Sequence, residues 1–127
     1  MAKTIQLLTA RCGKIRPDSV ADYLAHDGFS ALKKAMNMSP MEIINEVIDA
    51  KLLGRGGASY PAGKKWKQLY EIEGDPKYIV CNADEGEPGT FKDKVLLEKD
   101  PLSIIEGMAI AGYVFNSHEG YMAEIRN

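Results

Sequence analysis

The sequence has few cysteines and no long apolar run. Its two cysteines, Cys12 and Cys81, are far apart and form no CxxC pair, so we expect no metal or cluster site with cysteine ligands in this chain alone. Two cysteines beside six methionines fit a reduced, intracellular protein better than a secreted one. The longest apolar stretch runs from Gly107 to Phe115 and is too short to cross a bilayer.

The sequence also lacks an excess of charge of one sign. Sixteen basic and eighteen acidic residues give a net charge of −2, so no overall field would attract nucleic acid. The first residues, MAKTIQLLTARCG, show no clear cleavage pattern and predict no signal peptide. The composition, 45% apolar and 27% charged over 127 residues, is typical of one globular domain. We expect a cytoplasmic protein that does not bind nucleic acid and does not insert directly into a membrane.

Helical patterns fill the first 50 residues. In SPMEIINEVIDAKLLG, Ser39 is the predicted N-cap, Pro40 takes the first helical position, and Glu42 completes a capping box. Gly54 is expected to end this helix. The residues predicted to share its buried face are Met41, Ile44, Val47 and Ile48.

Two β-rich runs flank a long helical pattern in the second half. The run KYIVCNA, residues 77–83, predicts a buried strand, and EGYMAEI, residues 119–125, predicts another. Asp100 is expected to cap the helix between them, which begins at Pro101. Strand, helix and strand in one sheet imply a parallel βαβ unit. The predicted buried side of the helix is Ile104, Ile105, Met108, Ile110 and Ala111.

The fold class that follows is α/β, with N-terminal helices and an incomplete Rossmann-like parallel βαβ unit. We predict an N-terminal helical segment over residues 1–50 and a partial α/β domain over residues 51–127.

One glycine-rich stretch, GRGGASYPAGKKW at residues 54–66, has the composition of a phosphate-binding loop. Gly56 and Gly57 would let the backbone approach a ligand, and Gly63 could turn the chain into the next helix. A helix starting near Lys64 would aim free N–H groups at an anion. A surface turn with solvated lysines is the alternative. The basic residues that would add charge are Arg55, Lys64 and Lys65.

Two known phosphate-binding templates do not fit this stretch. A Walker A loop needs four residues between its glycines, but five separate Gly57 from Gly63, and Lys65 stands where Ser or Thr is required. The dinucleotide pattern GxGxxG would begin at Gly54 and finds Ser59 at its third glycine. The stretch therefore belongs to neither class.

A second stretch, CNADEGEPGTFKD, gathers carboxylates directly after the first predicted strand, where ligands bind in open α/β sheets. Asp84, Glu85 and Glu87 follow Asn82 closely, and such like charges are better tolerated beside a cation or hydroxyl donors. Ribose and ribityl hydroxyls are such donors. An acidic turn in water is the alternative. Together, the two stretches favour a nucleotide cofactor.

Three motifs give the sequence its family resemblance: GRGGASYPAGKKW, KYIVCNADEGEPGTFKD and DPLSIIEGMAIAGY. With them the sequence resembles the NADH-binding flavoprotein subunit of respiratory complex I, which also occurs in NAD-dependent formate dehydrogenases and NAD-linked hydrogenases. The match runs from about Cys12 to Tyr121. The resemblance implies the FMN-binding domain of that subunit, with hydride transfer from NADH to FMN and onward electron transfer to iron–sulfur clusters.

The resemblance also implies roles for individual residues. Tyr60 stands where an aromatic, usually Phe, stacks on the NADH adenine, and Lys65 matches a lysine that holds the cofactor. Glu87 matches the acidic residue beside flavin and nicotinamide. The remaining cofactor-binding positions are Gly54, Arg55, Gly56, Gly57 and Ala58 in the glycine loop, with Asn82, Asp84 and Glu85 for FMN. No residue is assigned as a proton donor.

The sequence departs from the family pattern at several points. Ser59 replaces a usual glycine, and Ala62 stands where threonine is common. The ending GYMAEIRN lacks the alternating aromatic strand of the family. The later family segments, among them the domain whose four cysteines hold a four-iron cluster, are not in this sequence.

We therefore expect the N-terminal part of such a flavoprotein, weak or inactive alone, whose partners are iron–sulfur subunits of a larger redox complex. One alternative is a cofactor-free piece that only self-associates or docks to other subunits, because its sheet edge would be exposed. An NTPase-like phosphate-binding domain is a third alternative, disfavoured by the missing Ser or Thr.

Overall fold

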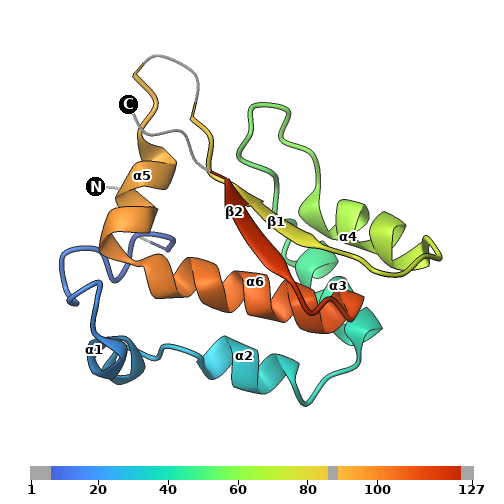
Figure 1. Cartoon of the computed structure of the whole chain (residues 1–127), viewed down its shortest axis with the longest axis horizontal. Coiled ribbons are helices and arrows are strands. Elements are labelled where there is room, and N and C mark those ends of the chain that lie inside the picture. The colour runs from blue at the N-terminus through green and yellow to red at the C-terminus, as the bar shows by residue number, and fades with distance from the viewer. Residues whose placement is uncertain (1–6, 86–88, 124–127) are drawn as a thin grey trace, which may run out of the picture.

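The structure is a computed structural model that describes residues 7–85 and 89–123. Short helices come first, followed by a strand, two helices and a second strand (Figure 1). The elements are α1 (Val20–Ala25), α2 (Ser30–Ala35), α3 (Pro40–Asp49), α4 (Ala62–Glu71), β1 (Ile79–Asn82), α5 (Lys92–Lys99), α6 (Pro101–Phe115) and β2 (Gly120–Ala123).

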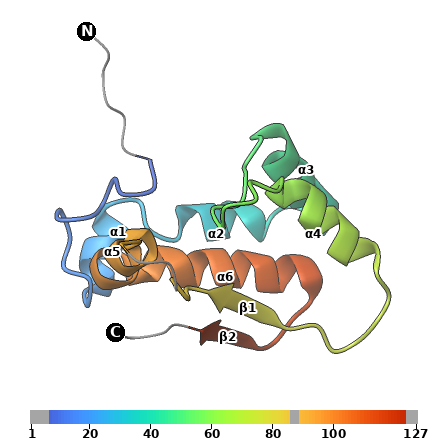
Figure 2. The ribbon, with the colours of Figure 1, turned by 90° about the horizontal axis from the view of Figure 1, so that it is seen from above.

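Helix α6 lies in the middle of the molecule. Figure 2 shows the sheet on one side of α6 and helices α2, α3 and α4 on the other. Strands β1 and β2 pair in parallel, with Ile79 opposite Gly120 and Asn82 opposite Ala123. The predicted α/β class and the incomplete parallel unit are therefore confirmed.

The strands are less buried than the sequence predicted. Only alternate residues of β1 face the interior, and Val80, on its other face, is 61% exposed. All four residues of β2 are exposed. The reason is that α6 packs against β1, an open hollow lies between α6 and β2, and no described residue forms a layer on the other face of the sheet. Glu124 and Ile125, which were predicted to continue the second strand, lie outside the described residues.

The capping box that the sequence predicted for α3 is confirmed. Ser39 Oγ accepts a hydrogen bond from the Glu42 N–H at 3.2 Å, and the Glu42 carboxylate accepts one from the Ser39 N–H, also at 3.2 Å. The helix ends at Asp49, not at Gly54, because Lys51 takes a left-handed φ of 54°.

The core lies where α3 meets α6. It contains Ile43 and Ile44 of α3, packed with Val114 and Phe115 of α6. The Trp66 ring of α4 packs edge-on against the Phe115 ring, with 5.5 Å between the ring centres. The predicted buried face of α3 was partly wrong. It omitted Ile43, which is buried, and it included Ile48, which is 39% exposed.

The predicted buried side of α6 was also partly wrong. Ile105 is 49% exposed, whereas the charged residue next to it, Glu106, is only 6% exposed. The error arises because α6 is apolar around most of its circumference, so its hydrophobic periodicity does not indicate which side turns inward.

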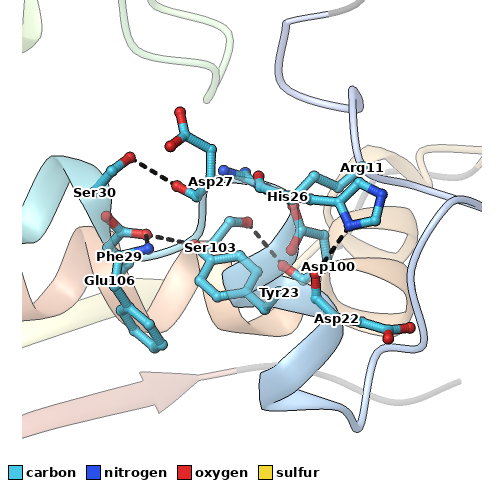
Figure 3. Close-up of polar contacts among 10 residues, drawn as sticks. All are labelled: Arg11, Asp22, Tyr23, His26, Asp27, Phe29, Ser30, Asp100, Ser103 and Glu106. Carbon is cyan, nitrogen blue, oxygen red and sulfur yellow. Dashed lines mark hydrogen bonds and ion pairs between the residues drawn. The ribbon is translucent and has the colours of Figure 1, made fainter.

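The buried Glu106 carboxylate joins α6 to the first two helices (Figure 3). Its Oε1 accepts hydrogen bonds from the Tyr23 hydroxyl at 2.5 Å and from the Phe29 N–H at 2.8 Å. Its Oε2 accepts one from the Leu32 N–H at 3.0 Å. Burial opposes ionisation, but these donors outweigh it and hold the pKa of Glu106 below its ordinary value. Burial and the carboxylate together raise the pKa of Tyr23.

Asp100 is the N-cap residue of α6 and Pro101 begins the helix, as the sequence predicted, but the Asp100 side chain does not cap it. Its carboxylate makes no hydrogen bond to the first turn of α6, and its side chain is only 1% exposed. It faces Arg11 instead, with 3.7 Å between Oδ2 and the guanidinium, and that guanidinium also lies 4.9 Å from the centre of the Tyr23 ring (Figure 3). The sequence could not reveal this partner, which lies far away in the chain.

In residues 7–85 and 89–123 no helix combines the length and apolar character that crossing a membrane requires.

Gly63 is a packing glycine inside α4, not the turn that the sequence predicted. A Cβ placed there would lie 2.5 Å from Cγ1 of Ile48 and 2.7 Å from its backbone nitrogen. The absence of a side chain at Gly63 therefore allows α4 to pack closely against α3.

We expect the Gly63→Ala substitution to lower the free energy of unfolding by about 1–3 kcal/mol, because the methyl group would push α3 and α4 apart. Urea denaturation measures this. Gly107→Ala is the matched control, since Gly107 is a helical glycine with no atom within 4 Å of an added Cβ. That variant should be neutral or slightly more stable. An equal loss in both variants would contradict the packing role.

The lowered pKa of Glu106 predicts acid sensitivity. The Glu106 carboxyl loses its proton more readily in the folded state than in the unfolded state. Its contribution to the free energy of unfolding is therefore fully present above the pKa of the unfolded state, about 4.3, and is lost as the pH falls through the lower pKa of the folded state. We expect Glu106→Gln to cost roughly 2 kcal/mol at pH 7, and to flatten the fall in stability below about pH 5.

The measurement is urea denaturation between pH 3 and pH 7 for both proteins. Glu46→Gln is the control, because the Glu46 side chain is 60% exposed and forms a surface ion pair with Lys34. If the free energy of unfolding falls as steeply with decreasing pH in Glu106→Gln as in the unsubstituted chain, Glu106 is not the source of the acid sensitivity.

Candidate functional site

The glycine-rich stretch forms a loop closed at its base by backbone hydrogen bonds. The Gly54 N–H donates to the Tyr60 carbonyl at 2.8 Å, and the Ala62 N–H donates to the Leu52 carbonyl at 2.9 Å. Leu53 and Pro61 form an isolated antiparallel bridge between these two bonds. The base fixes both ends of residues 55–59, which are all exposed.

The tip of the loop leaves room beside its backbone. A Cβ added at Gly56 or Gly57 would meet no atom within 4 Å, and Gly57 has a φ of 96°, which favours glycine. Gly54 differs, because a Cβ there would come within 3.3 Å of the Tyr60 carbonyl. The two tip glycines thus provide open backbone of the kind that a phosphate or a ring system can approach.

Ser59 occupies a position in this loop that would suit glycine. Its φ of 51° lies in the left-handed region, which costs a residue with a side chain roughly 1 kcal/mol. This is where the sequence departs from the glycine of the resembled family.

The loop leads directly into α4, which begins at Ala62 and not near Lys64 as the sequence predicted. The N–H of Ala62 is already bonded at the base of the loop, so it is not available to an anion. Lys64 and Lys65 lie in the first turn and are exposed, as are Arg55 and Ala58 in the loop.

Tyr60, the predicted stacking aromatic, contacts α4. Its hydroxyl donates to Oε1 of Gln68 at 3.1 Å, and the Lys64 Nζ lies 5.8 Å from the ring centre. The residue is 41% exposed. Gln68 was not singled out from the sequence. The spacing of Lys64 and Gln68, four residues apart on one helix, was the available signal.

The acidic stretch begins where β1 ends. Asn82 is the last residue of β1, and its Oδ1 accepts a hydrogen bond from the Asp84 N–H at 3.0 Å, which turns the chain away from the sheet. Both residues are exposed. Glu87, the acidic residue predicted beside the flavin, lies outside the described residues.

Glu85 is engaged with the start of α5. One carboxylate oxygen accepts from the Asp93 N–H and the other from the Lys94 N–H, both at 3.0 Å, and the Lys92 ammonium lies 3.8 Å away. Burial opposes ionisation of Glu85, but these N–H groups and Lys92 outweigh it and lower its pKa. The carboxylate thus supplies the cap that Phe91, the N-cap residue, does not provide.

The two loops project to the same side of the molecule. In Figure 1 the glycine loop and residues 83–85, which follow β1, both rise above α6. Two open hollows of about 710 Å³ each lie elsewhere, one between the end of α4 and α6, the other between α6 and β2. Within the described part of the chain, no three His, Cys, Asp or Glu residues are grouped to hold a metal ion.

Comparisons with known proteins connect both loops to one family. A family model described as the Nuo51 FMN-binding domain matches residues 47–127. An NADH-quinone oxidoreductase subunit of Aquifex aeolicus (strain VF5) is 49% identical over 119 residues, 94% of this chain and 28% of that protein. The NADP-reducing hydrogenase subunit HndC of Solidesulfovibrio fructosivorans is 44% identical over 118 residues, 93% of this chain and 24% of that protein.

A solved structure agrees with these matches. The crystal structure of an NAD⁺-reducing NiFe hydrogenase in the air-oxidised state is similar, with a TM-score of 0.63 and 42% sequence identity, over 66% of this chain and 15% of that one. The chain thus spans 28% or less of the lengths of the relatives named here.

We expect Ser59→Gly to raise the free energy of unfolding by about 0.5–1 kcal/mol, because glycine removes the left-handed strain at this position. Thermal or urea denaturation measures the gain. Ser59→Ala serves as the control, since alanine keeps a Cβ at the same φ and should give no gain. Equal effects of both substitutions would show that φ is not the cause.

Proposed function

Because the chain belongs to the family of Nuo51 FMN-binding domains, we propose that it forms one wall of the cofactor site in a flavoprotein subunit that oxidises NADH. Such a subunit passes a hydride from NADH to FMN and electrons onward to iron–sulfur subunits of a larger complex. The observation that carries the proposal is the open backbone at Gly56 and Gly57. We place this activity in the cytoplasm, and the four-iron cluster of the family outside this chain.

The glycine loop supplies the backbone of this wall. Gly56 and Gly57 would let a planar ring or phosphate come within contact distance of the main chain, and Arg55 and Lys65 would add positive charge. Tyr60 would stack on a base. The other loop residues assigned to the site are Gly54 and Ala58.

The acidic loop supplies acceptors for hydroxyl groups. Asn82 and Asp84 are exposed at the end of β1, where their side chains can meet a ribityl or ribose chain. Glu85 would contribute mainly by holding α5 in place, and Glu87 is assigned to the flavin side. FMN, when bound, supplies the two-electron chemistry, and the residues named here bind and orient it. We assign residues 51–127 to this domain and residues 1–50 to a helical segment that supports it.

A second candidate function is self-association without a cofactor. The exposed face of the sheet favours it: Tyr78 is 52% exposed, Val80 61% and Tyr121 56%, and the two tyrosine rings lie 6.2 Å apart. An uncovered apolar face of this kind is typical of an interaction surface.

Titration of the chain with FMN, followed by addition of NADH, tests the first proposal. We expect weak FMN binding and little NADH-driven bleaching, because the chain would hold only part of the site. Gly56→Ala should weaken FMN binding by roughly tenfold, since its methyl group would occupy the space beside the loop, and leave the thermal midpoint unchanged.

Gly107→Ala is the control and should bind FMN as the unsubstituted chain does. Tight, stoichiometric FMN binding with full bleaching would overturn the partial-site proposal in favour of a complete one. A colourless, multimeric sample that binds no FMN would favour self-association. Equal FMN affinity in Gly56→Ala would show that the glycine loop is not the contact.

A further inference from the structure

The Tyr60 side chain is held by two residues of the helix that follows it. Gln68 Oε1 accepts a hydrogen bond from its hydroxyl at 3.1 Å, and the Lys64 ammonium lies 5.8 Å from the ring centre. Lys64 and Gln68 are four residues apart on α4 and therefore lie on one face of that helix. The hydroxyl end of the ring is thus hydrogen-bonded to α4, and the Lys64 ammonium lies over its face at a cation–π distance.

These contacts restrict a side chain that its surroundings would otherwise leave free. Tyr60 is 41% exposed and lies at the end of an exposed loop, where a ring without partners would change rotamers. A ligand that stacks on a mobile ring must immobilise it, and this lowers affinity. A ring already fixed by a hydrogen bond and a cation avoids that cost.

We propose that Gln68 and Lys64 are positioning residues that hold Tyr60 ready to stack on the base of an adenine nucleotide. This inference rests on the proposed function, because it takes the glycine loop as the nucleotide-binding wall. Gln68 fixes the outer end of the ring through the hydroxyl. Lys64 covers part of the ring and places a positive charge beside the base, where a phosphate group follows in a nucleotide.

The hydroxyl of Tyr60 is essential to this arrangement. A phenylalanine at the same position could stack on a base but could not bond to Gln68. The pair therefore makes a joint prediction: removing either the hydroxyl or its acceptor should have the same effect, and removing both should add little.

The experiment uses the full 127-residue chain, with AMP and FMN as separate probes. We expect Gln68→Ala to weaken AMP binding by about threefold to tenfold, because AMP would then have to immobilise the Tyr60 ring on binding, and to leave FMN binding unchanged. Tyr60→Phe should match it, and the double variant should be no weaker than either single one.

A second readout reports the ring itself. In the unsubstituted chain, proton NMR should show nuclear Overhauser contacts between the Tyr60 ring and the Lys64 side chain. Gln68→Ala should weaken them, and Gln68→Glu, which keeps an acceptor, should restore them. Tyr70→Phe is the matched control, because Tyr70 is another partly exposed tyrosine on α4, 38% exposed.

The outcomes separate this inference from the function on which it rests. If Gln68→Ala binds AMP as tightly as the unsubstituted chain, or if the ring contacts are absent from that chain, positioning by Gln68 is wrong, while FMN binding can still support the proposed function. If the unsubstituted chain binds neither AMP nor FMN, the proposed function is wrong, and the positioning role falls with it.

Discussion

The arrangement of the helices depends on one buried carboxylate. Glu106, in the middle of α6, accepts hydrogen bonds from Tyr23 in α1, from Phe29 before α2 and from Leu32 within α2. A buried carboxylate is stable only when its oxygens have hydrogen-bond donors. The three donors therefore fix the positions of α1 and α2 relative to α6. Helix α6 also packs against α3, which precedes the glycine loop, and against β1, which precedes the acidic stretch. The same carboxylate therefore helps to hold in place the elements from which both loops extend.

The sequence predicted the features that depend on neighbouring residues. The capping box at Ser39 and the parallel pairing of the two strands need only local patterns and a connection of sufficient length. It did not predict the features that join distant segments. Asp100 is the predicted N-cap residue of α6, yet its carboxylate faces Arg11. Glu106 was not among the residues predicted to be buried, and its hydrogen-bond donors lie more than 70 residues away. No local pattern encodes such partners.

The candidate site shows the same division. Exposed glycines at the tip of the loop and acidic residues after β1 could be expected from composition and from the position of a strand end. Composition could not show which carboxylate already accepts hydrogen bonds from the protein. Glu85 and Asp84 are adjacent in the sequence, yet Glu85 is bonded to the first turn of α5 while Asp84 is exposed. Likewise, Gln68 gains its importance only because the loop brings Tyr60 back onto α4.

The cap at α5 also limits the geometry of any ligand. Each oxygen of Glu85 already accepts one N–H from the helix, so only the remaining lone pairs are open to a sugar hydroxyl. A hydroxyl that approached along the directions in use would have to displace a helix N–H, and the free energy of that loss would be subtracted from the free energy of binding. The helix therefore acts as a stereochemical filter, which decides from which side a hydroxyl can reach this carboxylate.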